Sequence, residues 1–149
     1  MKTLLFLLAA AAVLLIWGCK AKQPATEPEP EDSATGSLDE RLHDIWVLIS
    51  MDGKPLDRAQ ARPRLELYPG EGRISGNGGC NELFGQMEGR GDEIAFRNVG
   101  TTKKFCRDLM DMENTFLTRL QAVDHYHLKD LKLYLTEDKK DVLVFQKVD

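Results

Sequence analysis

The sequence lacks the short motifs that mark common enzymes and nucleotide-binding proteins. It contains no Gly-x-Ser-x-Gly, no His-Glu-x-x-His and no paired-carboxylate signature, and no Gly-Lys-Ser/Thr follows its glycine-rich stretch. A basic run is also missing, because 20 basic residues stand against 24 acidic ones and the lysine pairs at 103–104 and 139–140 are isolated. The net charge is −4. These features predict a protein that is not an enzyme, needs no cofactor and has no nucleic-acid partner.

No apolar run is long enough to span a bilayer. The N-terminal apolar run covers residues 4–17, whereas a spanning helix needs about 20 residues. With Lys2 before it, the run has the charged and apolar regions of a secretory signal. It ends in Leu15-Ile16-Trp17-Gly18-Cys19, which resembles the lipobox of bacterial lipoproteins, although Trp17 is bulkier than the residue usual there. The alternative is an ordinary signal anchor with an incidental cysteine.

The lipobox resemblance implies a protein anchored to a membrane by lipid. Residues 1–18 would be the lipoprotein signal peptide, removed before Cys19, whose thiol would be diacylated and whose new amino group would be acylated, for example with palmitate. A second fatty chain makes anchoring stable, since each buried CH₂ contributes about 0.8 kcal/mol. Lys20 stands where many lipoproteins retained in the inner membrane have Asp, which favours the outer membrane, facing the periplasm.

Residues 19–37 have the composition of a tether. Pro24, Pro28 and Pro30 alternate with acidic residues, and large apolar side chains are absent, so this stretch has nothing with which to form a core. We expect an extended spacer. The folded domain then covers residues 38–149, with its first element starting between Leu38 and Ile45.

The remaining sequence predicts a small α+β domain. Alternating apolar and polar residues, separated by turn signals, indicate about seven short strands in a curved antiparallel sheet. Trp46 opens an apolar strand and is expected in the core. Apolar residues at helical spacing over 109–123 predict one helix packed on the sheet, with Asp108 as its N-cap. We interpret that stripe, which includes Glu113, as core packing.

Two cysteines remain once Cys19 carries lipid. An even pair in an exported, oxidising compartment predicts a disulfide between Cys80 and Cys106. The alternatives are two free buried thiols or one reactive cysteine. A reactive thiol beside His43, His125 or His127 would permit a thiol-dependent enzyme of the envelope.

A second alternative is a metal-binding module through His125 and His127. Positions i and i+2 of a strand share a face, so both imidazoles could meet one ion. Because a useful site needs three or four ligands and no third is identified, we expect no metal.

The motifs that carry a family resemblance lie between residues 76 and 120. They are Gly76-Asn77-Gly78-Gly79-Cys80-Asn81, Gly85, Thr102-Lys103-Lys104-Phe105-Cys106 and a helix with Glu113. Their order, after an early tryptophan strand, resembles the META domain family, which includes the HslJ-like heat-shock proteins. Phe105 stands where that family often has a small residue. The motif residues Gly79, Cys80, Asn81, Gly85, Thr102 and Cys106 match the family pattern.

The resemblance implies a curved sheet with one packed helix, often in envelope lipoproteins, and carries no established active site. Some members are linked to stress and antibiotic tolerance, secretion or motility. We therefore expect a non-catalytic binding or structural domain held at the envelope, acting in stress tolerance, with the membrane and another envelope protein as partners. The glycines beside Asn77 suggest backbone with positive φ or a close approach to another chain segment.

Overall fold

The computed structural model describes residues 37–148, which form part of one compact unit. The predicted signal peptide, the lipid site Cys19 and all but the last residue of the predicted tether lie outside the described residues. No helix within 37–148 has the length and apolarity needed to cross a membrane.

Nine strands, one α-helix and two short 3-10 helices make up the described region. Their bounds are η1 Glu40–Leu42, β1 Ile45–Met51, β2 Lys54–Pro55, β3 Arg64–Tyr68, η2 Pro69–Glu71, β4 Arg73–Asn77, β5 Glu82–Arg90, β6 Glu93–Thr101, α1 Met110–Ala122, β7 His125–Lys129, β8 Lys132–Glu137 and β9 Lys140–Val148. The expected α+β class is confirmed, but the strands number nine rather than about seven. β2 has only two residues, too few to show an alternating pattern.

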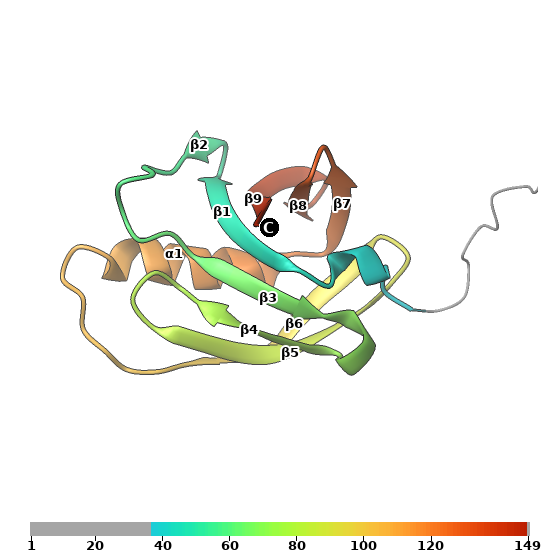
Figure 1. Ribbon diagram of the computed structural model, residues 1–149, viewed down its shortest axis with the longest axis horizontal. Helices are drawn as coiled ribbons and strands as arrows, with labels where there is room; N and C mark the ends of the chain where they lie inside the picture. Colours follow the sequence, from blue (N-terminus) through green and yellow to red (C-terminus); the bar gives the residue numbers. More distant parts are fainter. Residues whose placement is uncertain (1–36, 149) are drawn as a thin grey trace, which may run out of the picture. The chain divides into compact units, whose positions relative to one another are not determined.

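The strands form one antiparallel sheet that closes on itself (Figure 1). Neighbours follow the chain from β3 to β9, and β1 then pairs with both β3 and β9. The link between β6 and β7 is the thinnest, with Glu93 opposite His125 as its one register pair. Backbone hydrogen bonds from Ile94 to Asp124 and from Tyr126 to Asp92 support that link. The sheet is therefore closed as well as curved.

The core lies inside the closed sheet because alternate strand residues point inward. Leu65 and Leu67 of β3 and Leu133 and Leu135 of β8 are completely buried. Trp46 is only 2% exposed, and its indole N–H donates to the carbonyl of Leu42 at 2.9 Å. The prediction of a core tryptophan is therefore confirmed.

Helix α1 connects β6 to β7 and contributes its buried face to the core. Phe116 and Leu120 are completely buried, and the ring of Phe116 meets that of Phe145 edge-on, with centroids 6.3 Å apart. The predicted N-cap was wrong, because the helix begins after Leu109 and has no side-chain cap. Asp108 lies instead inside a turn closed by a hydrogen bond from Leu109 N–H to the Cys106 carbonyl.

Three of the hairpins share one kind of tight two-residue turn. Asp52-Gly53, Asp130-Leu131 and Asp138-Lys139 each have positive φ at both positions, as hairpin turns that follow strand twist require. The alternation of apolar and polar residues from Leu131 to Leu135 predicts a strand that starts at Leu131. It is instead a turn residue with φ of 58° and 65% exposure, an unusual conformation for a bulky side chain.

Candidate functional site

The glycine-rich motif forms the connection between β4 and β5. Gly79 has φ of 115°, and a side chain at Gly76 would collide with the backbone of Arg64 in β3. A Cβ at Gly78 would lie 2.8 Å from the side chain of Glu113. The expected positive φ and the expected close approach are both present. The missing side chain at Gly78 leaves room for the carboxylate of Glu113 from α1.

Glu113 is the charged centre of this arrangement, at 2% exposure. Its Oε2 accepts hydrogen bonds from the backbone N–H of Cys80 at 2.9 Å and of Asn81 at 2.6 Å. Its Oε1 accepts from Nδ2 of Asn81 at 2.7 Å. Burial raises the pKa of Glu113, but the hydrogen bonds from Asn81 and Cys80 outweigh it and leave the pKa below its ordinary value. The carboxylate is therefore ionised and held by three donors.

Asn81 carries the connection onward to the segment after β6. Its Oδ1 accepts from the backbone N–H of Lys104 at 2.6 Å and from the hydroxyl of Thr102 at 2.8 Å. Its Nδ2 also donates to the carbonyl of Lys104 at 3.2 Å. Asn81 is only 2% exposed. Its side chain thus links α1, the β4–β5 connection and the β6–α1 loop.

A covalent bond closes the same cluster. Cys80 and Cys106 form the predicted disulfide, with Cα atoms 5.9 Å apart. Neither cysteine of the described region therefore offers a free thiol. We call the group formed by residues 78–81, Thr102, Lys104, Cys106 and Glu113 the Glu113 clamp.

The clamp contains most, but not all, of the predicted motif residues. Gly79, Cys80, Asn81, Thr102 and Cys106 meet there, whereas Gly85 lies along β5, opposite Ile74. A Cβ at Gly85 would be 3.1 Å from the carbonyl of Arg97, at the point where the β5–β6 register shifts. Gly85 thus serves strand packing rather than the clamp.

Glu113 is the residue whose role the sequence reading missed. It was grouped with the apolar face of the helix as core packing. A single charged residue at an inward position of an otherwise apolar stripe was the available signal, because a buried carboxylate requires hydrogen-bond donors. Its donors come from a segment more than thirty residues earlier, so their identity could not be read from the helix.

The histidines are held by their neighbours. His125 Nδ1 lies 3.1 Å from Asp124 Oδ1, and this hydrogen bond raises the pKa of His125. The ring of His127 stacks on Tyr134 with centroids 4.5 Å apart, and that of His43 lies 5.3 Å from Tyr68. Across residues 37–148, no three His, Cys, Asp or Glu side chains gather as metal ligands would.

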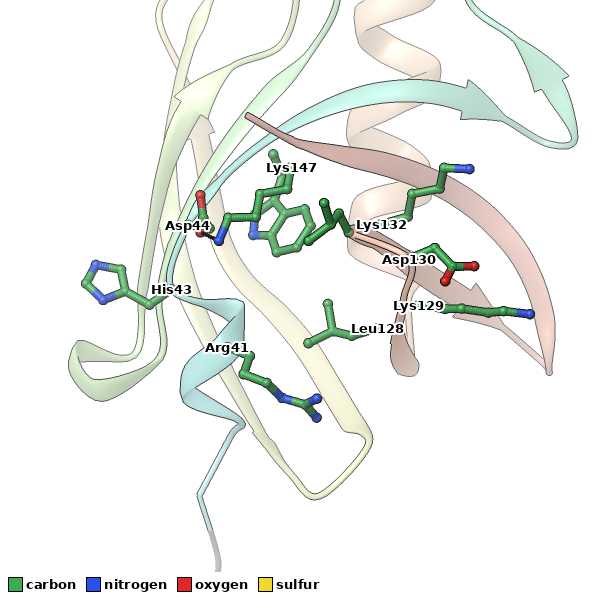
Figure 2. Close-up of a pocket in the computed structure, with 10 residues that line it drawn as sticks. Arg41, His43, Asp44, Leu128, Lys129, Asp130, Lys132 and Lys147 are labelled. Atoms are coloured by element: carbon green, nitrogen blue, oxygen red, sulfur yellow. Dashed lines mark ion pairs between the residues drawn. The ribbon is translucent and has the colours of Figure 1, made fainter. Parts of the chain in front are cut away.

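A cleft of about 330 Å³ lies between η1, the start of β1 and the β7–β8 hairpin (Figure 2). Trp46, Leu128 and Leu131 supply its apolar lining, and charged residues surround it, namely Arg41, Asp44, Lys129, Asp130, Lys132 and Lys147. Figure 2 shows Leu128 pointing toward the middle of the cleft, with the amino ends of Lys129 and Lys132 directed away from it. This is an apolar depression with a charged rim.

The charges of the rim are partly paired. Lys147 Nζ lies 2.6 Å from Asp44 Oδ2, and Arg41 forms an ion pair of 2.6 Å with Asp39. Burial raises the pKa of Asp44, but hydrogen bonds from Lys147 and the Ile45 N–H outweigh it, so the pKa is lowered. No cysteine lines the cleft, and Asp44 is paired with Lys147, which suits binding better than proton transfer.

Comparison with solved structures agrees with this architecture. An NMR structure of a protein from Burkholderia xenovorans matches with a TM-score of 0.58 and 23% identity, over 82% of this chain and 97% of that one. The crystal structure of a DUF4847 family protein from Bacteroides vulgatus matches with a TM-score of 0.53 and 16% identity, over 74% and 99%. At such identities the likeness concerns the fold. No curated protein matches the sequence.

The sequence itself places the domain in a family. The model of the META domain matches residues 40–149, a span that includes the Glu113 clamp, the disulfide and every strand of the closed sheet. The chain belongs to the META domain family.

Proposed function

We propose that this chain is a lipid-anchored, non-catalytic binding module of the bacterial cell envelope. In this proposal Cys19 carries the lipid, the Pro/Glu-rich segment separates the domain from the outer membrane, and the cleft holds a partner protein. A role in envelope stress tolerance, as in some relatives, is the phenotype to measure in cells lacking the protein.

The proposal that the domain is non-catalytic rests on one observation, namely that the polar groups and thiols of the motif are bonded to one another. Glu113 accepts three hydrogen bonds, Asn81 is bonded at both ends of its amide, and both motif cysteines are oxidised. Catalysis needs an acid, base or nucleophile that can reach a substrate. A clamp whose reactive groups are all engaged internally favours a structural role for the motif and leaves the surface for binding.

Two features favour the envelope. The disulfide is typical of proteins that fold in an oxidising compartment. The sequence from Leu15 to Cys19 has the order of a lipobox.

The cleft is the best candidate for the contact with a partner protein. Its apolar lining offers burial to one side chain of the partner. On the rim, the Lys147–Asp44 pair would fix orientation together with Lys129 and Lys132, which have no ion-pair partner within the described part of the chain. Leu131 keeps a large apolar side chain exposed at the tip of a turn where its backbone conformation is unfavourable. Strain of this kind is typical of binding positions.

The intact mass of the mature protein, with and without reduction and alkylation, tests the anchoring. We expect a chain that starts at a lipid-modified Cys19 and reveals two thiols only after reduction. A chain that retains residues 1–18, or a Cys19 without lipid, would contradict the anchor.

Photo-crosslinking in living cells tests the cleft. A photoreactive residue at position 131 should give one defined product, whereas the same residue at position 139, in the equivalent place of the β8–β9 turn, should not. The product should weaken when Leu128→Arg fills the cleft. Equal crosslinked products at both positions, or a product unaffected by Leu128→Arg, would contradict the proposal that the cleft binds a partner protein.

A further inference from the structure

The loop between β6 and α1 exposes the largest unpartnered apolar side chain of the described region. Phe105 is 79% exposed, the highest value among the large hydrophobic residues of 37–148. Lys103, Lys104 and Arg107 on either side of it are also exposed. We call residues 102–109 the Phe105 loop. One exposed aromatic side chain therefore lies among three exposed basic ones.

The backbone of this loop is fixed from inside. Lys104 is held by Asn81 at both its N–H and its carbonyl, and Cys106 is bonded to Cys80. Phe105 lies between these two anchor points and points outward, although an apolar side chain gains free energy from burial. The clamp therefore presents Phe105 in an ordered loop, so little conformational entropy is lost when it is covered.

A second exposed aromatic lies where the loop begins. Phe84 of β5 is 58% exposed, and a Cβ at Gly100 would be 2.7 Å from its ring. The N–H of Thr102, the first residue of the loop, donates to the carbonyl of Glu82 at 3.0 Å. Phe84 and the Phe105 loop therefore belong to one surface.

Two further cations lie on the neighbouring loop between β2 and β3. That loop carries Arg58 and Arg62, and the carbonyl of Ala61 is 3.6 Å from a Cβ built at Gly79 in the clamp. In Figure 1 the β2–β3 loop and the β6–α1 loop lie at the same end of the domain. The exposed acidic residues on or next to these loops are Asp57, Glu82, Asp108 and Asp111.

The exposed charge at this end is less acidic than that of the whole chain. Five cations face four exposed acids here, with Glu113 buried beneath them, whereas the chain carries −4. Within residues 37–148, none of the five cations has an ion-pair partner. The five are Arg58, Arg62, Lys103, Lys104 and Arg107.

We propose that this end of the domain, centred on the Phe105 loop, docks on an anionic lipid bilayer surface. Lysine and arginine side chains would contact headgroup phosphates while Phe105 enters the boundary between headgroups and acyl chains. The inference rests on the proposed anchoring, which keeps the domain close to a bilayer. Two exposed aromatic rings, those of Phe84 and Phe105, among five cations suit a fluid anionic surface better than a protein pocket, which would need a larger apolar contact.

Hydrogen exchange of the full-length mature protein in vesicles tests the proposal. Flotation with phosphatidylcholine vesicles first reports the lipid anchor alone. Exchange of the 103–107 segment is then compared between these vesicles and vesicles that also contain phosphatidylglycerol. We expect slower exchange with phosphatidylglycerol, reversed by high salt. If the protein fails to float with neutral vesicles, the anchor is wrong, and the same chain added to anionic vesicles still tests the loop.

Matched variants separate the contributions of charge and of the aromatic ring. Relative to the wild type, Phe105→Ser should weaken binding of the loop to the anionic surface about tenfold, and K103E/K104E about 25-fold or more. The controls should leave binding of the loop unchanged. They are K139E/K140E, with the same change in net charge at another turn, and Ile45→Ser, at an exposed apolar residue at the start of β1. Unchanged melting temperatures would show that all four variants fold.

Two results would overturn the proposal. One is equal exchange in neutral and anionic vesicles. The other is protection that depends on Lys103 and Lys104 but is indifferent to Phe105→Ser, which would indicate a soluble or polymeric polyanion, or an acidic protein, instead of a bilayer.

Discussion

In the Glu113 clamp, the carboxylate of Glu113 and the amide of Asn81 are buried, and the partners of both lie within the domain. In the cleft beside η1, charged side chains surround an apolar depression, and Lys129 and Lys132 have no ion-pair partner among residues 37–148. The clamp joins segments far apart in sequence through a carboxylate, an amide and a disulfide. The cleft is bounded by η1, β1 and the tip of a hairpin.

The two regions show that a charged residue can contribute either to the stability of the domain or to recognition of a partner. Removing a clamp residue leaves buried donors or acceptors without partners, so stability should suffer first. Removing a rim residue of the cleft changes a solvent-exposed contact, so stability should change little while recognition changes. The family motif lies almost entirely in the clamp, and it therefore describes how the domain holds together.

The largest effect is expected for Glu113→Ala. Two backbone N–H groups and the amide of Asn81 would lose their acceptor in a site that is 2% exposed. We expect a loss of about 3–5 kcal/mol of unfolding free energy, measured by urea denaturation. Lys132→Glu at the cleft, as the control, should change it by less than about 0.5 kcal/mol. If both variants lost similar amounts of unfolding free energy, the clamp and the cleft would not differ in their contribution to stability.

Loss of the disulfide should follow in size. Cys80→Ala combined with Cys106→Ala releases a loop of 26 residues in separation, which corresponds to about 3.5 kcal/mol in the chain-entropy account. Urea denaturation of the wild type with and without reductant measures the same change without substitution. If the unfolding free energy fell by well below 1 kcal/mol in both experiments, the hydrogen bonds of the clamp would be sufficient to stabilise the domain without the disulfide.

The pH dependence of stability sharpens the assignment of charge to Glu113. Its folded pKa lies below the ordinary value of 4.5, so its contribution is complete above pH 4.5. Below that pH the unfolded chain takes up a proton before the folded one does, and the contribution falls as pH approaches the folded pKa. The wild type should therefore lose more stability than Glu113→Gln between neutral pH and this acid range. Parallel curves would contradict an ionised Glu113.

The smallest effect is expected at the cleft and has the opposite sign. Leu131→Asn should stabilise the protein by about 0.5–1 kcal/mol, because asparagine tolerates the left-handed conformation better than leucine. Lys139→Asn, in the other turn with the same geometry, should stabilise it similarly. With the photoreactive residue moved to position 129 on the rim of the cleft, only Leu131→Asn should reduce crosslinking. Destabilisation by both variants would show that the turns are not strained.

Local patterns allowed much of the fold to be predicted. The alternation around Leu65 and Leu133, the apolar spacing of α1 and the two remaining cysteines predicted strands, a helix and a disulfide that the structure contains. β2 could not be predicted because two residues are too few to show an alternating pattern. Asp108 was wrongly predicted as the N-cap because the turn after Cys106 moves the start of the helix to Met110.

The sites were less predictable because their partners are distant in the chain. The motif identified Cys80, Asn81 and Thr102, but only the folded structure brings Glu113 to their backbone. Arg41 and Leu128 meet at the cleft although nearly ninety positions separate them, and neither belongs to a motif. Leu131 was read as a strand residue because nothing in its local pattern distinguishes a strained turn from the start of a strand.

The pairing of β1 with β9 also determines when this protein can fold. β1 is made first, yet one of its two long partners is the last strand of the sheet. A chain that crosses a membrane from its N-terminus would have to keep β1 without that neighbour until residues 140–148 have emerged. Contacts between such distant segments also form slowly. If the chain is exported as proposed, completion of the domain would be tied to the end of translocation, and a chain held back by even its last strand would display an unpaired edge.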